Sequence, residues 1–241
     1  NNAGVRDIRT CTSPDFLEWT DPQMLEYTGS PEQALYTNQI LPYYRAPHIL
    51  LGFPMRYVER GWSPSMRALP DLEKRELRSA AHIRYGTAIT ETQIMASRDG
   101  VLFNRCNEAF LSPGIQRPDS WYYAHNAVAL NMVTTRSSLS GAPDELSFYA
   151  SSGNWHGEGA KLTRHTLRMD GFVSVSSPFE GGEVVTRPVL FKGSSLHVNF
   201  ATSAAGTLKV EMQTVTGQPI KGFTLDDADE TFGNELDRTV T

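Results

Sequence analysis

The first candidate for chemistry is Asp7, a carboxylate flanked by two cations. It stands between Arg6 and Arg9, close to the start of an expected strand. A neighbouring guanidinium favours the charged form of a carboxylate, which suits a group that accepts ligand hydroxyls or stabilises a cationic transition state. The alternative is a structural ion pair, since such pairs place carboxylates in the same surroundings.

A second carboxylate, Glu108, precedes a loop over residues 111–122 that is rich in proline and glycine. It lies two residues before Phe110, and a carboxylate beside an aromatic ring at the mouth of a loop is a candidate general acid. The alternative is that Glu108 anchors the loop through a salt bridge with Arg105 or Arg117.

Several cationic and imidazole side chains precede or begin apolar strands. His48 heads the apolar run that ends at Tyr57, Arg45 lies just before it, and His125 begins another expected strand. Each histidine suits a ligand or cation contact in a central channel, and each equally suits a hydrogen-bonded place in the core. Both interpretations stay open for these residues.

Two segments that position such groups share one pattern of residues. Arg9–Trp19 and Met95–Phe103 each contain a strand, a Ser-x-Asp triplet, a short turn and an aromatic residue, and the triplets lie 84 residues apart. An aspartate in this position binds the backbone amides that follow it, and the aromatic returns to the face of the sheet. The pattern predicts a repeated blade of a β-propeller, with chance similarity as the alternative. We expect Asp15 and Asp99 to cap their own turns.

Composition excludes several classes of function. The net charge of −5 and the pI near 5.7 do not fit a nucleic-acid partner, and no apolar run reaches the about 18 residues of a membrane span. The sequence has no His-x-x-x-His, no paired cysteines, no phosphate-binding glycine loop and no serine nucleophile elbow. We expect Cys11 and Cys106 to be free, and no metal or cofactor except a structural cation in a propeller channel.

The pattern of the chain predicts an all-β protein of two domains. The one convincing helix, over 71–78, lies in a charged insertion around 58–84, and its charge spacing is typical of a solvated surface helix. After residue 171 short strands alternate with glycine-rich turns, which predicts a β-sandwich. We therefore expect propeller blades over 1–175 and a sandwich over 176–241. The expected strands include 5–12, 36–44, 48–57, 87–96, 101–105, 126–135, 145–151, 161–169, 183–190, 195–202 and 206–213.

The phrases Ser13–Trp19 and Ser97–Phe103 resemble the outer-strand motif S-x-D-[LG]-x-x-[WF] of five-bladed propeller glycosidases, the β-fructosidase and arabinanase groups. Arg6–Arg9 and Leu35–His48 are similar to an uncharacterised bacterial branch of these enzymes. Their layout, a propeller followed by a sandwich, agrees with the change in composition. Sialidase propellers carry a related Ser-x-Asp box, so that relationship stays open as well.

The resemblance implies hydrolysis of glycosidic bonds by two carboxylates at the funnel of the propeller. In these enzymes the nucleophile or base lies on the first blade. The sequence accounts for about two and a half blades where closure needs about four, so we expect further N-terminal blades or a partner chain to complete the propeller. The acid is expected in the segment Tyr36–Asn38, which holds no carboxylate.

The sequence therefore predicts a glycoside hydrolase that acts on an oligo- or polysaccharide, exported to the periplasm or medium. Asp7 and Glu108 are its candidate catalytic residues. Trp121 and Trp155 lie in loops, where aromatic faces stack on sugar rings or fill the spaces between blades. The alternatives are a non-catalytic carbohydrate-binding module and a structural protein completed by partner strands. The candidate substrate-binding residues are Arg6, Asn38, Arg45, His48, Trp121, His125 and Trp155.

Overall fold

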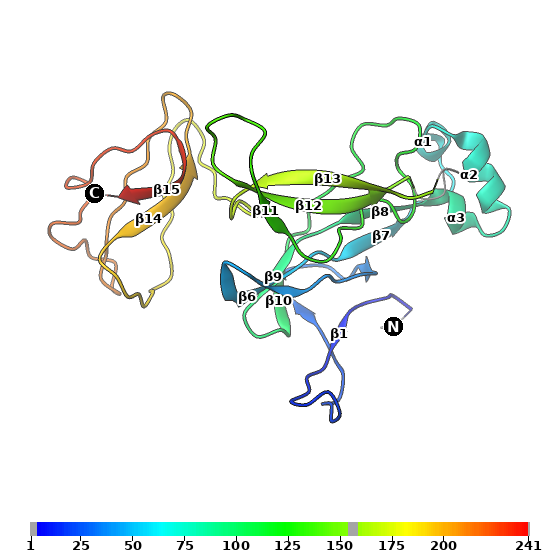
Figure 1. Ribbon diagram of the computed structural model, residues 1–241, viewed down its shortest axis with the longest axis horizontal. Helices are drawn as coiled ribbons and strands as arrows, with labels where there is room; N and C mark the ends of the chain where they lie inside the picture. Colours follow the sequence, from blue (N-terminus) through cyan, green and yellow to red (C-terminus); the bar gives the residue numbers. More distant parts are fainter. Residues whose placement is uncertain (1–3, 154–158, 241) are drawn as a thin grey trace. The chain divides into compact units, whose positions relative to one another are not determined.

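A computed structural model describes residues 4–153 and 159–240 (Figure 1). Strands account for 32% of the chain and helices for 7%, which confirms the all-β class. Two compact units are formed, Asn1–Val133 with Ser147–Thr166, and Thr134–Leu146 with Leu167–Thr241. The strands of the described residues close into neither a barrel nor a propeller. The propeller, the sandwich and the boundary at 175/176 stay predictions.

Two long runs of extended chain form the centre of the first unit. One run is β6 (Ala46–Gly52) followed by β7 (Met55–Glu59), and the other is β8 (Ala88–Thr92) followed by β9 (Met95–Ser97). β6 pairs antiparallel with β9, and β7 pairs antiparallel with β8. The first sheet has the order β3-β10-β9-β6-β5 and the second β4-β7-β8, with β3 at Glu26–Tyr27, β4 at Ala34–Leu35, β5 at Leu41–Tyr43 and β10 at Leu102–Arg105.

Both runs break at the same level because of Pro54. Proline has no N–H to donate to a strand ladder, but its carbonyl accepts the amide of Gln93 at 2.9 Å. Next to this break the backbone of Gly52 lies close to the opposite strand, and a Cβ at this position would be 2.8 Å from Cε of Met95. The predicted strand over 48–57 is therefore two strands that belong to two sheets.

The core of the first sheet consists of apolar side chains from both ends of the unit. Phe103 of β10 is fully buried there, at 0% exposure. A short hairpin of β1 (Arg9–Thr10) and β2 (Gln23–Met24) precedes this sheet. The buried members of the core are Ile8, Leu25, Leu35, Met95 and Phe103.

Three short helices connect β7 to β8. They are α1 (Pro64–Arg67), α2 (Leu72–Ser79) and α3 (Ile83–Thr87), so the predicted helix over 71–78 is confirmed. α3 packs closely on α2 because Gly86 has no side chain: a Cβ there would lie 2.0 Å from the carbonyl oxygen of Arg75. Arg75 is fully buried, and the prediction of a solvated helix is wrong for this residue.

The remaining strands lie nearer the C-terminus. A third sheet has the order β11-β12-β13, and a fourth pairs β14 with β15 antiparallel. Their bounds are Val133–Thr135 for β11, Glu145–Ser152 for β12, Lys161–Arg168 for β13, Leu196–Ala201 for β14 and Asn234–Val240 for β15.

The second unit is organised by one polar side chain, Arg168. Its Nε donates to Oδ1 of Asn199 at 2.6 Å, and its Nη2 donates to the carbonyl of Phe200 at 2.9 Å. The predicted strand over 183–190 does not form, although its residues are largely β-branched and apolar. No backbone hydrogen bond joins this segment to another described strand, so its apolar side chains stay exposed.

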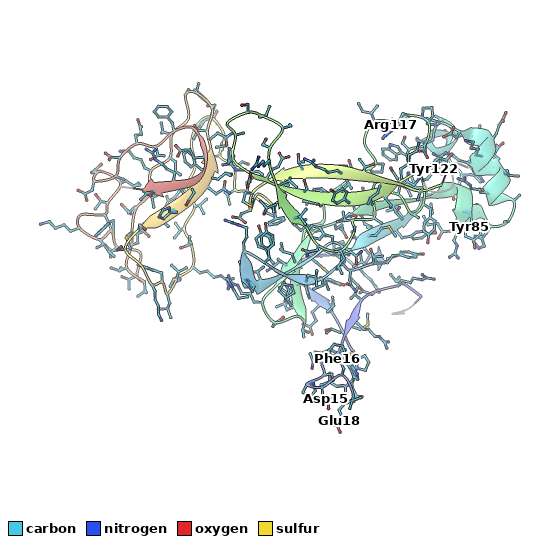
Figure 2. All side chains as sticks on the ribbon, viewed as in Figure 1. Asp15, Phe16, Glu18, Tyr85, Arg117 and Tyr122 are labelled. Carbon is cyan, nitrogen blue, oxygen red and sulfur yellow. The ribbon has the colours of Figure 1, made fainter. Side chains whose placement is uncertain are left out.

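The two Ser-x-Asp turns have the same hydrogen bonds. Oδ1 of Asp15 accepts the amides two and three residues later at 2.8 and 2.9 Å, and Oδ1 of Asp99 accepts the corresponding amides at 2.9 Å each. These amides lower the pKa of both carboxyls below the ordinary value for aspartate. Their expected role as turn caps is confirmed. Figure 2 shows Asp15, Phe16 and Glu18 together at the tip of the first turn.

The repeated turns differ in what their aromatic residues contact. Phe103 is fully buried in the core, whereas Trp19 is 51% exposed and touches the ring of Phe16 edge-on at 5.5 Å. The same local structure therefore supports a core contact in one copy and a surface contact in the other.

This difference predicts unequal effects of the same substitution. Asp99→Ala should lower the urea midpoint of unfolding more than Asp15→Ala, because the turn of Asp99 places Phe103 in the core. Because both pKa values are lowered, the difference should be present above the ordinary aspartate pKa and should fade as the pH falls through the folded-state values. Equal midpoints for the two variants at pH 7 would contradict it.

Candidate functional site

A small pocket in the first unit is lined only by tyrosines and arginines. Its volume is about 50 Å³, enough for a few water molecules or one small polar group. None of the side chains that line it is acidic. The lining residues are Arg6, Tyr36, Tyr57, Arg84, Tyr85 and Tyr123.

The second sheet positions two of these tyrosines. Tyr57 lies in β7 opposite Ala34 of β4, and the amide of Tyr36 donates to the carbonyl of Met55 at 2.9 Å. Side chains of successive strand residues point to opposite faces. Tyr57 therefore lies on the pocket face, while the adjacent Arg56 forms an ion pair with Glu91 across the β7–β8 ladder.

Three tyrosine rings form a triangle around the pocket. The centroid of Tyr36 lies 5.2 Å from that of Tyr57 and 6.0 Å from that of Tyr123, and the last two are 5.9 Å apart. Their planes are inclined at 47° to 83°, a range that includes the edge-to-face geometry aromatic pairs prefer. The rings thus pack against one another around the pocket.

The phenols of the triangle keep their protons. Burial, with the nearby carboxylate of Glu59, raises the pKa of Tyr57 to about 12. Burial also raises the pKa of Tyr123, against the opposing effect of Arg6 and Arg84. Near neutral pH both side chains are therefore uncharged hydroxyls that can donate or accept a hydrogen bond.

Two guanidinium groups complete the lining. Cζ of Arg6 lies 4.7 Å from the ring centroid of Tyr36, and Cζ of Arg84 lies 5.4 Å from that of Tyr85, both within cation–π range. A hydrogen bond with Tyr85 raises the pKa of Arg84. Figure 2 shows Tyr85 at the surface of α3. The arginines are 78 residues apart in the sequence, yet both contact aromatic faces at one pocket.

The loop that carries Tyr123 is fixed by a buried cation. Nη1 of Arg75 donates to the carbonyl of Trp121, and Nη2 donates to that of Ser120, both at 2.9 Å. The guanidinium also lies 3.9 Å from the ring centroid of Tyr122. α2 therefore determines where the backbone next to Tyr123 runs.

The same loop contains a cluster of left-handed residues other than glycine. Asp119, Trp121, Ala124 and Asn126 have φ values of 64°, 62°, 62° and 61°, and each such conformation costs roughly 1–2 kcal/mol. A side chain of β8 stabilises this backbone, because Oγ1 of Thr90 donates a hydrogen bond to the carbonyl of His125 at 2.7 Å. Strain of this kind is found preferentially where a side chain must be aimed at a ligand.

The predicted catalytic carboxylates lie outside the pocket lining. Oδ1 of Asp7 accepts the hydroxyl of Tyr27 at 2.7 Å and the amide of Ile8 at 2.8 Å, and the Tyr27 ring lies 4.3 Å from Cζ of Arg105. Glu108 is exposed after β10, and no hydrogen bond or ion pair joins it to the other described side chains. The catalytic roles of both residues stay predictions.

The predicted binding residues are dispersed along the sheets. Arg6 lines the pocket. Asn38 caps its own turn through the amide of Ile40 at 3.2 Å. Arg45 and His48 are exposed at the β5–β6 turn and in β6, twelve and nine residues before Tyr57 in the sequence, and neither lines the pocket.

The remaining candidates lie in or near the loop fixed by Arg75. The Trp121 indole donates to the carbonyl of Gly114 at 2.9 Å and packs against the cluster of Met66 and its neighbours. His125 is buried, 5.6 Å from the ring of Tyr122. Trp155 lies outside the described residues.

Sequence reasoning missed most of the lining. Arg6 was named as a binding candidate, while Tyr36 and Tyr57 were expected only as residues of the strands over 36–44 and 48–57. Arg84 falls at the end of the charged insertion around 58–84, and Tyr85 and Tyr123 were not among the candidates. The pocket forms where β4, β7, α3 and two loops lie together, and no local sequence pattern predicts that they do.

Metal and membrane features are absent from the part of the chain that the structure describes. Within residues 4–153 and 159–240, no three His, Cys, Asp or Glu side chains gather as metal ligands would. No helix in these ranges is long and apolar enough to span a bilayer. Cys11 and Cys106 are free thiols.

Comparisons with known proteins identify no relative of this chain. No protein-family model matches it, and no match is found among curated proteins or solved structures. The function therefore has to be argued from the chemistry of the pocket and from the sequence motifs.

The buried guanidinium yields a stability prediction. Arg75→Met should lower the free energy of unfolding by about 3 kcal/mol or more, because it leaves buried carbonyls without donors. Arg67→Met is the matched control: its ion pair with Glu76, at 3.0 Å, is half exposed and should contribute less than about 1 kcal/mol. Urea denaturation at neutral pH measures both, and similar losses in the two variants would count against the role of Arg75.

The raised pKa of Tyr57 yields a titration prediction. The difference in phenolate absorbance between wild type and Tyr57→Phe should develop well above pH 10, centred near pH 12. Since the folded-state pKa exceeds the ordinary value, this hydroxyl stabilises the fold fully below pH 10 and loses its effect as the pH rises towards 12. A difference curve centred at pH 10 in folded protein would refute the burial of this phenol.

Proposed function

We propose that the protein recognises a saccharide at the tyrosine–arginine pocket. The observation that carries the proposal is the composition of the lining: aromatic faces for the apolar face of a sugar ring, next to phenol and guanidinium groups for its oxygens. The strained loop that places Tyr123 supports it, because this backbone costs stability and is held by a dedicated buried cation.

The size of the pocket defines how such a ligand would bind. A volume of about 50 Å³ does not hold a sugar ring. One substituent of the ring enters the pocket, and the ring itself rests on the aromatic side chains at its mouth. Tyr85 of α3 belongs to the lining and is partly exposed, so its ring is available to such a contact.

We further propose the propeller and sandwich architecture as the setting of this site. The two Ser-x-Asp turns support it, since they repeat the motif of the propeller glycosidases with matching hydrogen bonds. Four neighbouring strands of the five-stranded first sheet, β10, β9, β6 and β5, are paired antiparallel, as the four strands of a blade are. An experimentally determined structure of the chain would test the arrangement.

The proposal is tested by binding measurements with the complete 241-residue chain. Isothermal titration with mono- and oligosaccharides of varied composition should identify a ligand, and Tyr57→Phe should weaken its affinity about five- to tenfold through loss of one hydrogen bond. Tyr149→Phe is the matched control, because Tyr149 lies on β12 and is not part of the lining. If no saccharide in the panel binds wild type, the proposal fails.

Glycoside hydrolysis is the second candidate function. It is favoured by the position of Asp7, directly next to Arg6 of the pocket lining. Turnover of aryl-glycosides or oligosaccharides by wild type, lost in Asp7→Asn or Glu108→Gln with folding intact, supports hydrolysis. Saccharide binding without turnover leaves recognition alone as the function.

A further inference from the structure

We propose that the substituent entering the pocket is anionic, so that the ligand is an acidic saccharide with a carboxylate or sulfate group. This inference rests on the proposed saccharide recognition and specifies its ligand class. Its starting point is the chemistry of the lining: four tyrosines, two arginines and no acid.

Every polar group of the lining can donate a hydrogen bond, and the guanidinium groups can do nothing else. Arginine has five N–H donors and no acceptor, whereas a phenol can take either role. A neutral sugar hydroxyl both donates and accepts hydrogen bonds. In this lining the phenol oxygens are its available side-chain acceptors. A carboxylate or sulfate accepts at every oxygen and therefore matches the whole lining.

The phenols are in the protonation state that an anion requires. The raised pKa values of Tyr57 and Tyr123 keep both as neutral donors. A phenolate in this position would repel an anionic ligand. The charge of Arg6 and Arg84 opposes burial in its effect on Tyr123, so both guanidinium groups act on the same small volume.

A carboxylate that acts on the pocket is that of Glu59. It acts on Tyr57 as a charge and as a hydrogen-bond partner and raises its pKa, but it is exposed at the end of β7 and does not line the pocket. The lining itself therefore carries two positive charges and no negative one. An anion is bound more strongly than a neutral group in this pocket, because its hydrogen bonds with Arg6 and Arg84 are charge-assisted. Such hydrogen bonds are about twice as strong as neutral ones.

The volume of the pocket favours the same kind of group. About 50 Å³ accommodates a carboxylate or a sulfate, each of which brings two or three accepting oxygens into a space of a few waters. Arg6 and Arg84 come from different segments and both line the pocket, so one anion can contact both guanidinium groups. Planar guanidinium groups favour this arrangement because they bind such oxygens in pairs.

The test compares matched sugars on the complete chain by isothermal titration at low salt. Glucose is compared with glucuronate, galactose with galacturonate, and N-acetylglucosamine with its 6-sulfate, and short oligomers of each are added. We expect at least one acidic form to bind about tenfold or more tightly than its neutral partner, with affinity falling as salt is raised. The uronate and sulfate arms show which anionic group is preferred.

Variants connect the preference to the two arginines. Arg6→Gln and Arg84→Gln should each weaken binding of the acidic sugar about ten- to hundredfold, and Arg84→Lys should retain part of the affinity by keeping the charge. Arg98→Gln, on the exposed turn after β9, removes the same charge outside the lining and should have little effect. Circular dichroism and urea midpoints confirm that each variant is folded.

The outcomes separate this inference from the proposed function. Equal affinity for the neutral and acidic forms overturns the inference and leaves saccharide recognition standing. Binding of acetate or sulfate ions as tight as that of the sugars also overturns it, because the pocket would then be an anion site without sugar recognition. Absence of binding by every sugar overturns the proposed function and the inference with it.

Discussion

The burial of the Arg75 guanidinium is the interaction on which the candidate site depends. A buried cation is tolerable only when its donors are satisfied, and here backbone carbonyls of the following loop supply the acceptors. The dependence is mutual: α2 keeps its charge in the interior because the loop surrounds it, and the loop keeps four left-handed residues because the guanidinium and the threonines of β8 hold it. Helix, loop and β8 therefore form one cooperative element, and Tyr123 takes its position from it.

The pocket itself is a balance between burial and positive charge. Packing three tyrosine rings together removes their hydroxyls from water, which disfavours the phenolate. The adjacent guanidinium groups act in the opposite direction, but burial prevails for Tyr57 and Tyr123. The result is a set of neutral donors next to fixed positive charges. Water can satisfy such a surface only in part within a small volume, so a ligand rich in accepting oxygens gains by replacing it.

The sequence predicted the features that depend on neighbouring residues. The all-β class, the helix over 71–78 and the turns capped by Asp15 and Asp99 all follow from local hydrogen bonding or periodicity, and all are present. The sequence predictions fail where the local structure depends on contacts with residues far away in the sequence. The segment 183–190 has the residues of a strand but no strand to pair with. The charges of α2 have the spacing of a solvated helix, yet Arg75 turns inward because acceptors from a loop 45 residues later reach it.

The two Ser-x-Asp turns show where this limit lies. Their backbones are fixed by an aspartate and the amides that follow it, so sequence alone is sufficient to predict them. In one copy the left-handed turn position is Gly100, and in the other it is Phe16, a residue for which this conformation is costly. Phe103 packs into the core formed with Met95 of β9 and its neighbours, whereas Trp19 is half exposed and packs on the ring of Phe16. The same motif thus specifies a backbone but not its surroundings. The lining of the pocket comes from five separate segments. It therefore depends entirely on contacts between distant residues, which a local motif does not specify.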